Sequence, residues 1–150
     1  STLHTNDAPS TISRLMNMGI EPFLVSSSVN LICAQRLVRR VCAACAQPAP
    51  VPSQALAKAG FSPEDARTVV PQHGAGCEKC SNTGYKGRVG LYEVMDISES
   101  LKELVLVGAS SQELRRKAIE EGMITLRQSG IEKIKAGVTT MEEVLRETVN

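Results

Sequence analysis

Two pairs of cysteines are the residues of this chain whose types and spacing best suit chemistry. The first pair is Cys42 and Cys45, the second is Cys77 and Cys80, and 31 residues lie between the pairs. Two residues between paired thiols allow one tight turn to direct both sulfurs to the same point, and two such pairs supply the four thiolates of a tetrahedral zinc shell. A closed shell leaves no position for water. The spacing therefore predicts a structural zinc site and not a catalytic one.

Other uses of these cysteines fit the sequence less well. Disulfides would need an oxidising compartment, but the chain shows no secretory signal and carries a fifth cysteine, Cys33. A redox Cys-x-x-Cys motif would explain one pair and give the other no role. Cys33 lies in an apolar run and is predicted to be a small buried hydrophobic residue. Zinc is the favoured interpretation, with redox or coincidental cysteines as the alternatives.

The composition limits the class of protein. The 150 residues allow one ordinary domain or two small ones, with 42% hydrophobic residues but only 3% aromatic ones, so the core must be aliphatic. A net charge of +1 argues against an electrostatic partner for the whole chain, although the middle of the chain is locally basic. No apolar run approaches the ~18 residues of a membrane span. We expect a soluble protein of a reducing compartment.

The first part of the chain has the pattern of an α/β protein. Residues 1–7 read as the end of a strand and a polar loop, and Asp7 is a plausible N-cap for a helix that Gly19 ends. A strand, a polar loop and a helix are how α/β domains place phosphate-sensing or catalytic residues. A second short helix follows from Pro22, and residues 29–41 are predicted to form one or more strands. We infer that the chain is a fragment of a larger α/β protein.

The remaining chain is predicted to contain short elements. Three prolines in residues 46–52 are expected to prevent regular strand pairing, and short helices are expected over 54–59 and from Pro63. Alternating side chains over 89–95 predict a strand. Four short helices should then begin near Ser98, Ser110, Thr125 and Thr140, with capping boxes at the second and fourth.

Several ordered stretches together resemble the C-terminal part of the secretion ATPases that drive type II secretion and type IV pilus assembly. Residues 1–8 resemble their histidine box, and residues 34–39 resemble the strand that leaves the nucleotide-binding core. The four cysteines match the tetracysteine metal loop, residues 84–90 match the sequence after it, and residues 137–145 match the ending. The resemblance covers nearly the whole chain and is weakest across residues 46–72.

This resemblance implies an α/β fold in three parts. Residues 1–41 would be the truncated end of a RecA-like P-loop NTPase core, residues 42–95 a zinc-binding tetracysteine subdomain with the following strand, and residues 96–150 a C-terminal bundle of short helices. The parent would be a hexameric motor, cytoplasmic and peripheral to the bacterial inner membrane, that hydrolyses ATP to extend a pilus or pseudopilus. Its partners would be its own subunits, an inner-membrane platform and cytoplasmic-side secretion or pilus proteins, with no nucleic acid and no direct membrane span. The tetracysteine loop favours the assembly or secretion branch over retraction motors.

Two single residues have candidate roles, the first from the resemblance and the second from its place in the chain. His4 would lie near the γ-phosphate of ATP in the parent. The chain has no G-x-x-x-x-G-K-[ST] motif, so ATP and Mg²⁺ are expected only in the parent and this chain alone should be inactive. Arg88 follows the metal loop on a strand, where a fixed guanidinium could reach a carboxylate or nucleotide of a neighbouring subunit.

One alternative function uses the same cysteines. A nucleic-acid-binding zinc ribbon would combine them with the basic cluster Arg36, Arg39 and Arg40. The near-zero net charge and the scarcity of aromatic residues near this cluster argue against that function.

Overall fold

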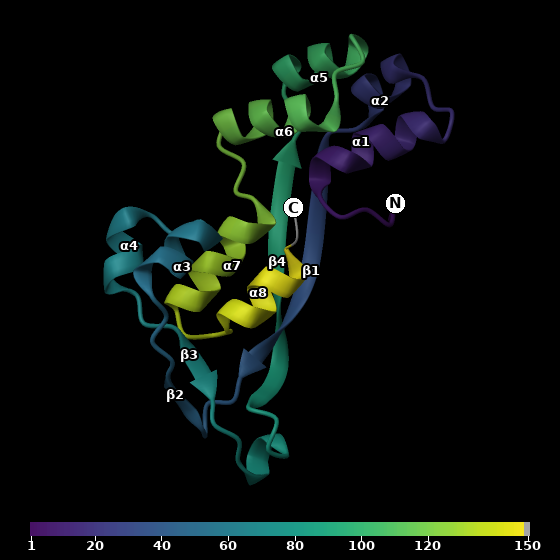
Figure 1. The fold of residues 1–150 in the computed structure, drawn as a ribbon. Coiled ribbons are helices and arrows are strands. Elements are labelled where there is room, and N and C mark those ends of the chain that lie inside the picture. The colour runs from purple at the N-terminus through teal and green to yellow at the C-terminus, as the bar shows by residue number, and fades with distance from the viewer. Residues whose placement is uncertain (149–150) are drawn as a thin grey trace. The chain divides into compact units, whose positions relative to one another are not determined.

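A computed structural model describes residues 1–148 and shows a mixed α/β protein, as predicted. Two compact units make up the chain, and each is assembled from two separate stretches of sequence. Unit 1 contains residues 1–35 and 92–125, and unit 2 contains residues 36–91 and 126–150. Figure 1 follows the order of the elements along the chain.

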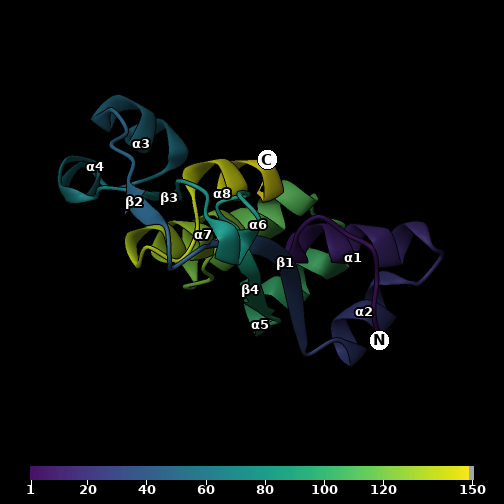
Figure 2. The same ribbon diagram turned by 90° about the horizontal axis from the view of Figure 1, so that it is seen from below.

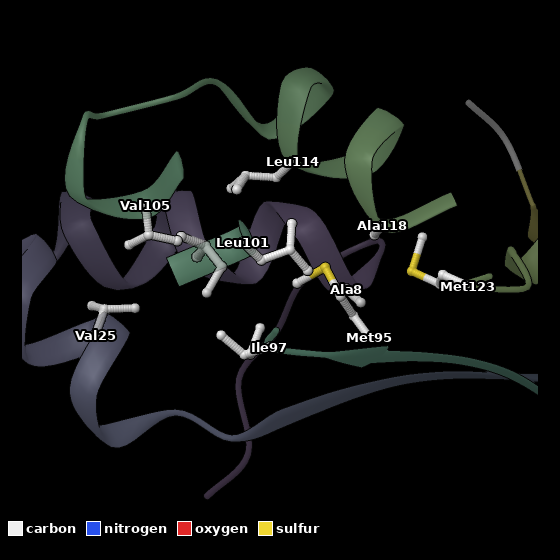
Figure 3. Close-up of a cluster of buried hydrophobic side chains, with 10 residues drawn as sticks. Ala8, Val25, Met95, Ile97, Leu101, Val105, Leu114, Ala118 and Met123 are labelled. Atoms are coloured by element: carbon white, nitrogen blue, oxygen red, sulfur yellow. The ribbon is translucent and has the colours of Figure 1, made fainter. Parts of the chain in front are cut away.

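Unit 1 consists of four helices that pack around one aliphatic core. The helices are α1 (Ala8–Asn17), α2 (Pro22–Ser28), α5 (Glu99–Leu106) and α6 (Ser111–Glu120). Helix α1 packs against α2 and α6, and α5 packs against the same two helices. Figure 3 shows the apolar side chains that meet between them, which include Val25, Leu101, Val105 and Leu114. All of these helices occur where the sequence predicted them.

Side-chain caps define where these helices begin. Asp7 Oδ1 accepts a hydrogen bond from the Ser10 N–H at 2.9 Å at the start of α1. The Ser98 and Ser110 hydroxyls accept from backbone N–H groups in the first turns of α5 and α6. Because such caps satisfy donors that the helix cannot pair internally, they are readable in the sequence.

The strands β1 (Leu31–Val41) and β4 (Tyr85–Asp96) form a long two-stranded ribbon that contributes to both units. Figure 1 shows that they run in opposite directions. On β4 the side chains of Leu91, Glu93 and Met95 are buried and those between them are exposed, which confirms the predicted alternation.

The expected burial of Cys33 is wrong. Its side chain is exposed because the neighbouring β1 residues Ile32 and Ala34 face the core of unit 1, and alternate residues of a strand point to opposite faces.

Strand β4 contains a bulge. The Cys42 N–H donates to the Gly84 carbonyl at 2.9 Å, and the Ile97 N–H donates to the Asn30 carbonyl at 3.0 Å. Between these two bonds β4 advances 13 residues (97 − 84) while β1 advances 12 (42 − 30), so β4 carries one extra residue. Gly87 has a φ of +84°, the left-handed conformation that glycine adopts at one kind of bulge, and we therefore assign the extra residue to Gly87.

Unit 2 contains the other helices and a second small sheet. The helices are α3 (Ser53–Ala59), α4 (Pro63–Thr68), α7 (Leu126–Lys135) and α8 (Met141–Glu147), with a 3₁₀ turn at Glu78–Cys80. Figure 2 shows α7 beside α8. A second core, which includes Leu56, Phe61, Ile131 and Val144, joins these helices.

The second sheet corrects one expectation. Strands β2 (Ala46–Pro48) and β3 (Gln72–Gly74) pair in antiparallel fashion, although the prolines of this region were expected to prevent regular pairing. Pro48 lies at the end of β2, opposite Gln72, and a proline at the end of an edge strand removes little of the ladder.

The four C-terminal helices are divided between the two units: α5 and α6 belong to unit 1, and α7 and α8 to unit 2. The division into residues 1–41, 42–95 and 96–150, which concerns the domains of a parent protein, stays a prediction. Among the described residues, none of the helices has both the length and the apolar character that crossing a membrane requires.

Candidate metal centre

The two cysteine pairs come together in unit 2. The sulfur atoms of Cys42, Cys45, Cys77 and Cys80 all lie within 4.8 Å of one another. The Sγ–Sγ distance is 3.8 Å from Cys42 to Cys77, 3.8 Å from Cys45 to Cys80 and 3.7 Å from Cys77 to Cys80. Four sulfurs bound at about 2.3 Å to one tetrahedral ion lie about 3.8 Å apart. The four thiols therefore have the spacing of a tetrahedral metal shell, and Cys33 lies outside it.

Backbone N–H groups surround the sulfurs. The Gly84 N–H and the Cys77 N–H each donate to Cys80 Sγ at 3.3 Å, and the Gly76 N–H donates to Cys45 Sγ at 3.4 Å. Such donors stabilise negative charge on sulfur, because they offer it a partner that water would otherwise provide. The polypeptide thus supplies a second layer of contacts around the four thiols.

Glycines allow the two cysteine loops to approach closely. A Cβ atom on Gly74 would lie 2.0 Å from the Gly84 carbonyl oxygen, and one on Gly84 would lie 2.5 Å from the Gly74 carbonyl oxygen. Gly84 also has a φ of +80°. No other residue fits this contact without movement of the backbone. Gly84, the first glycine after the second cysteine pair, serves this packing.

The protein environment affects the thiols differently. Desolvation, with further help from the neighbouring thiols, raises the pKa of Cys45 to about 12 despite the Gly76 N–H. Desolvation also opposes ionisation of Cys80, but the N–H groups of Gly84 and Cys77 outweigh it and lower the pKa of Cys80 to about 6. Cys80 therefore ionises more readily than Cys45, and bound thiol protons leave when a metal binds.

An ion pair between an exposed arginine and a buried carboxylate connects β1 to α8 close to the metal loop. Both oxygens of Glu143, whose side chain is 1% exposed, accept hydrogen bonds from Arg39: Oε2 from the backbone N–H at 2.8 Å, and Oε1 from the guanidinium at 2.7 and 3.0 Å. The Arg39 guanidinium also stacks over Tyr85, 4.1 Å from the ring centroid. The Tyr85 hydroxyl is hydrogen-bonded to Thr140 at 3.0 Å. This network ties the strand that enters the metal loop, the strand that leaves it and α8 together.

Sequence reasoning missed this network. Glu143 was interpreted as the acidic member of a capping box begun by Thr140, whose hydroxyl does accept from the Glu143 N–H. The Glu143 carboxylate instead pairs with Arg146 in the same helix and, across a long stretch of sequence, with Arg39, 104 positions earlier. No local pattern in the sequence signals such a partner.

Arg88 lies on β4 directly after the bulge at Gly87, and it is exposed. Within residues 1–148 its side chain makes no hydrogen bond or ion pair. Its role at a subunit interface stays a prediction.

His4 lies in unit 1, and therefore in a different unit from the four cysteines. It is exposed, and residues 1–5 have no regular secondary structure, so the expected strand end is not observed. A strand needs a neighbour to bond with, and no other strand of the described chain pairs with these residues. The role of His4 near a phosphate also stays a prediction.

The sequence also missed Glu93, a buried acidic residue of unit 1. A signal for it exists, because Glu93 occupies an inward position of the alternating strand between Leu91 and Met95. Its carboxyl oxygen accepts a hydrogen bond from the Ala8 N–H at 2.9 Å.

Comparisons with known proteins agree with the family resemblance of the sequence. The family model described as "Type II/IV secretion system protein" matches residues 1–146. The type IV pilus assembly ATPase PilB of Myxococcus xanthus is 56% identical over 149 residues, which are 99% of this chain and 26% of that protein. The type II secretion system protein E of Dickeya dadantii is 43% identical over 99% of this chain and 29% of that protein. The PilB protein of Thermus thermophilus is 40% identical over 99% of this chain and 17% of that protein.

The chain thus spans about a quarter of the length of the curated relatives that it matches. The match includes the cysteine pairs, the residues around them and the histidine-bearing start, because it extends over almost every residue. The chain belongs to the type II/IV secretion system protein family.

Proposed function

We propose that this chain is the zinc-binding C-terminal part of an ATPase that powers pilus assembly or type II secretion. The observation that carries the proposal is the cluster of four thiols with tetrahedral spacing in a chain whose relatives are named as pilus assembly ATPases and secretion proteins. In the assembled motor the chain would act as a structural module that binds metal and takes part in subunit contacts.

Zinc is the metal that best fits the site. Four thiolates in a closed shell suit Zn²⁺ and leave no open position, so the ion would fix the base of the 31-residue excursion between the pairs rather than perform chemistry. Metal analysis of the purified chain should give one zinc per chain. The Cys77→Ser variant should lose most of the metal, whereas the Cys33→Ser variant should keep it. Equal losses from both variants would overturn the assignment.

ATP hydrolysis would belong to the complete ATPase and not to this chain. The complete protein would form a hexamer in the cytoplasm at the inner membrane, bind ATP with Mg²⁺, and work with the inner-membrane platform and cytoplasmic secretion or pilus proteins. This chain has no phosphate-binding loop of the G-x-x-x-x-G-K-[ST] type to hold the β and γ phosphates. Calorimetric titration of the chain with Mg-ATP should show no saturable micromolar binding. Such binding, if abolished by His4→Ala, would contradict this part of the proposal.

Arg88 would act between subunits of the hexamer. Its exposure, its permanent charge and its place beside the Gly87 bulge support a reach to a carboxylate or nucleotide of the neighbouring subunit. In the complete ATPase, Arg88→Ala should lower ATPase activity or hexamer formation and leave the zinc content unchanged. The matched control is Lys86→Ala, which removes an exposed cation two residues earlier on the same strand. If the Arg88→Ala variant keeps full activity and assembles normally, Arg88 has no role between subunits and is an ordinary surface residue.

A further inference from the structure

Glu93 is an acidic residue in a place where apolar residues are expected. Its side chain is 1% exposed, and its strand neighbours on the same face are Leu91 and Met95, which are equally buried. A carboxyl group in such surroundings destabilises the fold unless hydrogen bonds compensate for the lost water. One of these bonds comes from the Ala8 N–H, which donates to Glu93 Oε1 at 2.9 Å.

This bond fixes the start of helix α1. Ala8 is the first residue of the helix, and its N–H has no partner within the helix. An acidic group at this end is also favoured by the helix dipole. Asp7, directly before the helix, supplies one such group, and Glu93 supplies a second from β4, 85 positions along the chain.

The residues directly after His4 are held by further contacts. The Thr5 hydroxyl is hydrogen-bonded to the Thr11 hydroxyl at 2.9 Å, and Asp7 Oδ2 accepts from Arg115 on α6 at 3.1 Å. His4 itself is exposed and makes no hydrogen bond within residues 1–148. The structure thus combines a fixed segment with a free imidazole at its edge.

We propose that Glu93 is a positioning residue for His4: it holds the start of α1, and with it the segment that presents the imidazole to the nucleotide. This inference rests on the proposed function, and also on the prediction from the sequence that His4 lies beside ATP in the complete protein. Glu93 would not touch the nucleotide. Glu93 would affect the reaction only through the position of His4. A small displacement of a group that reacts with or senses the nucleotide lowers turnover strongly.

The first measurement uses this chain alone and tests the contact. Hydrogen exchange of the Ala8 amide, measured by NMR, should be at least about fivefold faster in Glu93→Ala than in the wild type, because the amide loses its buried acceptor. Glu93→Gln keeps one acceptor oxygen and should lie between the two. The matched control is Asp96→Asn, which changes an exposed acid on the same strand and should leave Ala8 exchange unchanged. Unchanged exchange in Glu93→Ala would overturn the inference.

The second measurement uses the complete ATPase and separates positioning from general stability. At a temperature where every variant is folded, Glu93→Ala should lower kcat about tenfold and change KM for ATP less than about twofold. Glu93→Gln should keep kcat within about threefold of the wild type. In a His4→Ala background, Glu93→Ala should cause no further loss, because both changes act through the same side chain.

The outcomes distinguish this inference from the proposed function. If His4→Ala lowers kcat but Glu93→Ala leaves it unchanged, or if the two losses add, the positioning role is overturned and the proposed function stands. If His4→Ala keeps full kcat, the role of His4 is wrong, and the positioning role falls with it. If the wild-type protein hydrolyses no ATP, the proposed function itself is overturned.

Discussion

Removing the Glu143 carboxylate should destabilise unit 2 by about 3 kcal/mol. The Glu143→Ala variant leaves the Arg39 backbone N–H without its acceptor, which costs ~1–3 kcal/mol for a buried donor. The guanidinium groups of Arg39 and Arg146 together add about 1 kcal/mol, because their side chains are 44% and 51% exposed and return to water when the partner is lost. The loss of stability in Glu143→Ala therefore comes mainly from the backbone N–H of Arg39 that is left without an acceptor. A loss of about 3 kcal/mol corresponds to a Tm lowered by roughly 6–12 °C for a chain of this size.

Glu143→Gln separates the two contributions. The amide oxygen still accepts a hydrogen bond from the Arg39 N–H. This variant should therefore lose only about 1 kcal/mol of unfolding free energy, which is the contribution of the carboxylate charge. The control is Glu142→Ala, an exposed neighbour in the same turn of α8, which should cost less than about 0.5 kcal/mol. Urea unfolding of the zinc-loaded proteins measures the change in unfolding free energy for all three variants. A Glu143→Ala variant as stable as the Glu142→Ala control would refute the reasoning.

The pH dependence of the same variants has a defined sign. Desolvation alone would raise the pKa of Glu143, but the hydrogen bonds and charge of Arg39, with the charge of Arg146, outweigh it and lower the pKa. A carboxylate whose pKa is lowered by folding contributes stability above its unfolded pKa of about 4.3, and this contribution is lost as the pH falls through the folded value. The stability difference between wild type and Glu143→Gln should therefore be constant from pH 7 to about 5 and shrink below pH 4. A difference that grows in acid would contradict this.

Three further predictions concern glycines. Gly130→Ala should destabilise the chain by about 1–3 kcal/mol in urea unfolding, because the added Cβ would lie 2.4 Å from a Val144 methyl group where α7 meets α8. Gly84→Ala should weaken zinc binding in a competition assay with a chelator, because its Cβ would lie 2.5 Å from the Gly74 carbonyl oxygen and force the cysteine loops apart. Gly87→Ala should cost about 1–2 kcal/mol through its left-handed φ alone, since its nearest neighbour would be a side-chain atom at 3.6 Å, and it should leave zinc content intact.

Local patterns in the sequence predicted the local structure well. The N-caps Asp7, Ser62 and Ser98 each begin a helix, and the spacing of the four cysteines predicted their cluster. These signals act within a few residues, so neither the rest of the fold nor a partner is needed to read them.

Local sequence patterns could not predict contacts between residues that are far apart in the chain. The partner of Glu143 lies on another strand, and the partner of Glu93 is the start of a helix 85 positions away. The exposure of Cys33 depends on which face of β1 packs against the core, which its apolar neighbours do not reveal. The bulge at Gly87 follows from a difference of one residue between two strands and needs both strands to be seen.

The interleaved make-up of the two units limits how the chain can be cut and how it folds. Each unit takes one stretch from the first 91 residues and a second from the remainder, so the polypeptide passes between units three times. No continuous fragment shorter than residues 1–125 contains all of unit 1, and no continuous fragment that contains all of unit 1 leaves out residues 36–91 of unit 2. During synthesis, residues 1–35 must wait for residues 92–125 before their core is complete, while the intervening cysteine loop can already bind metal. Metal binding can therefore precede completion of the histidine-bearing unit, and a loaded metal site does not report that the rest of the chain is folded.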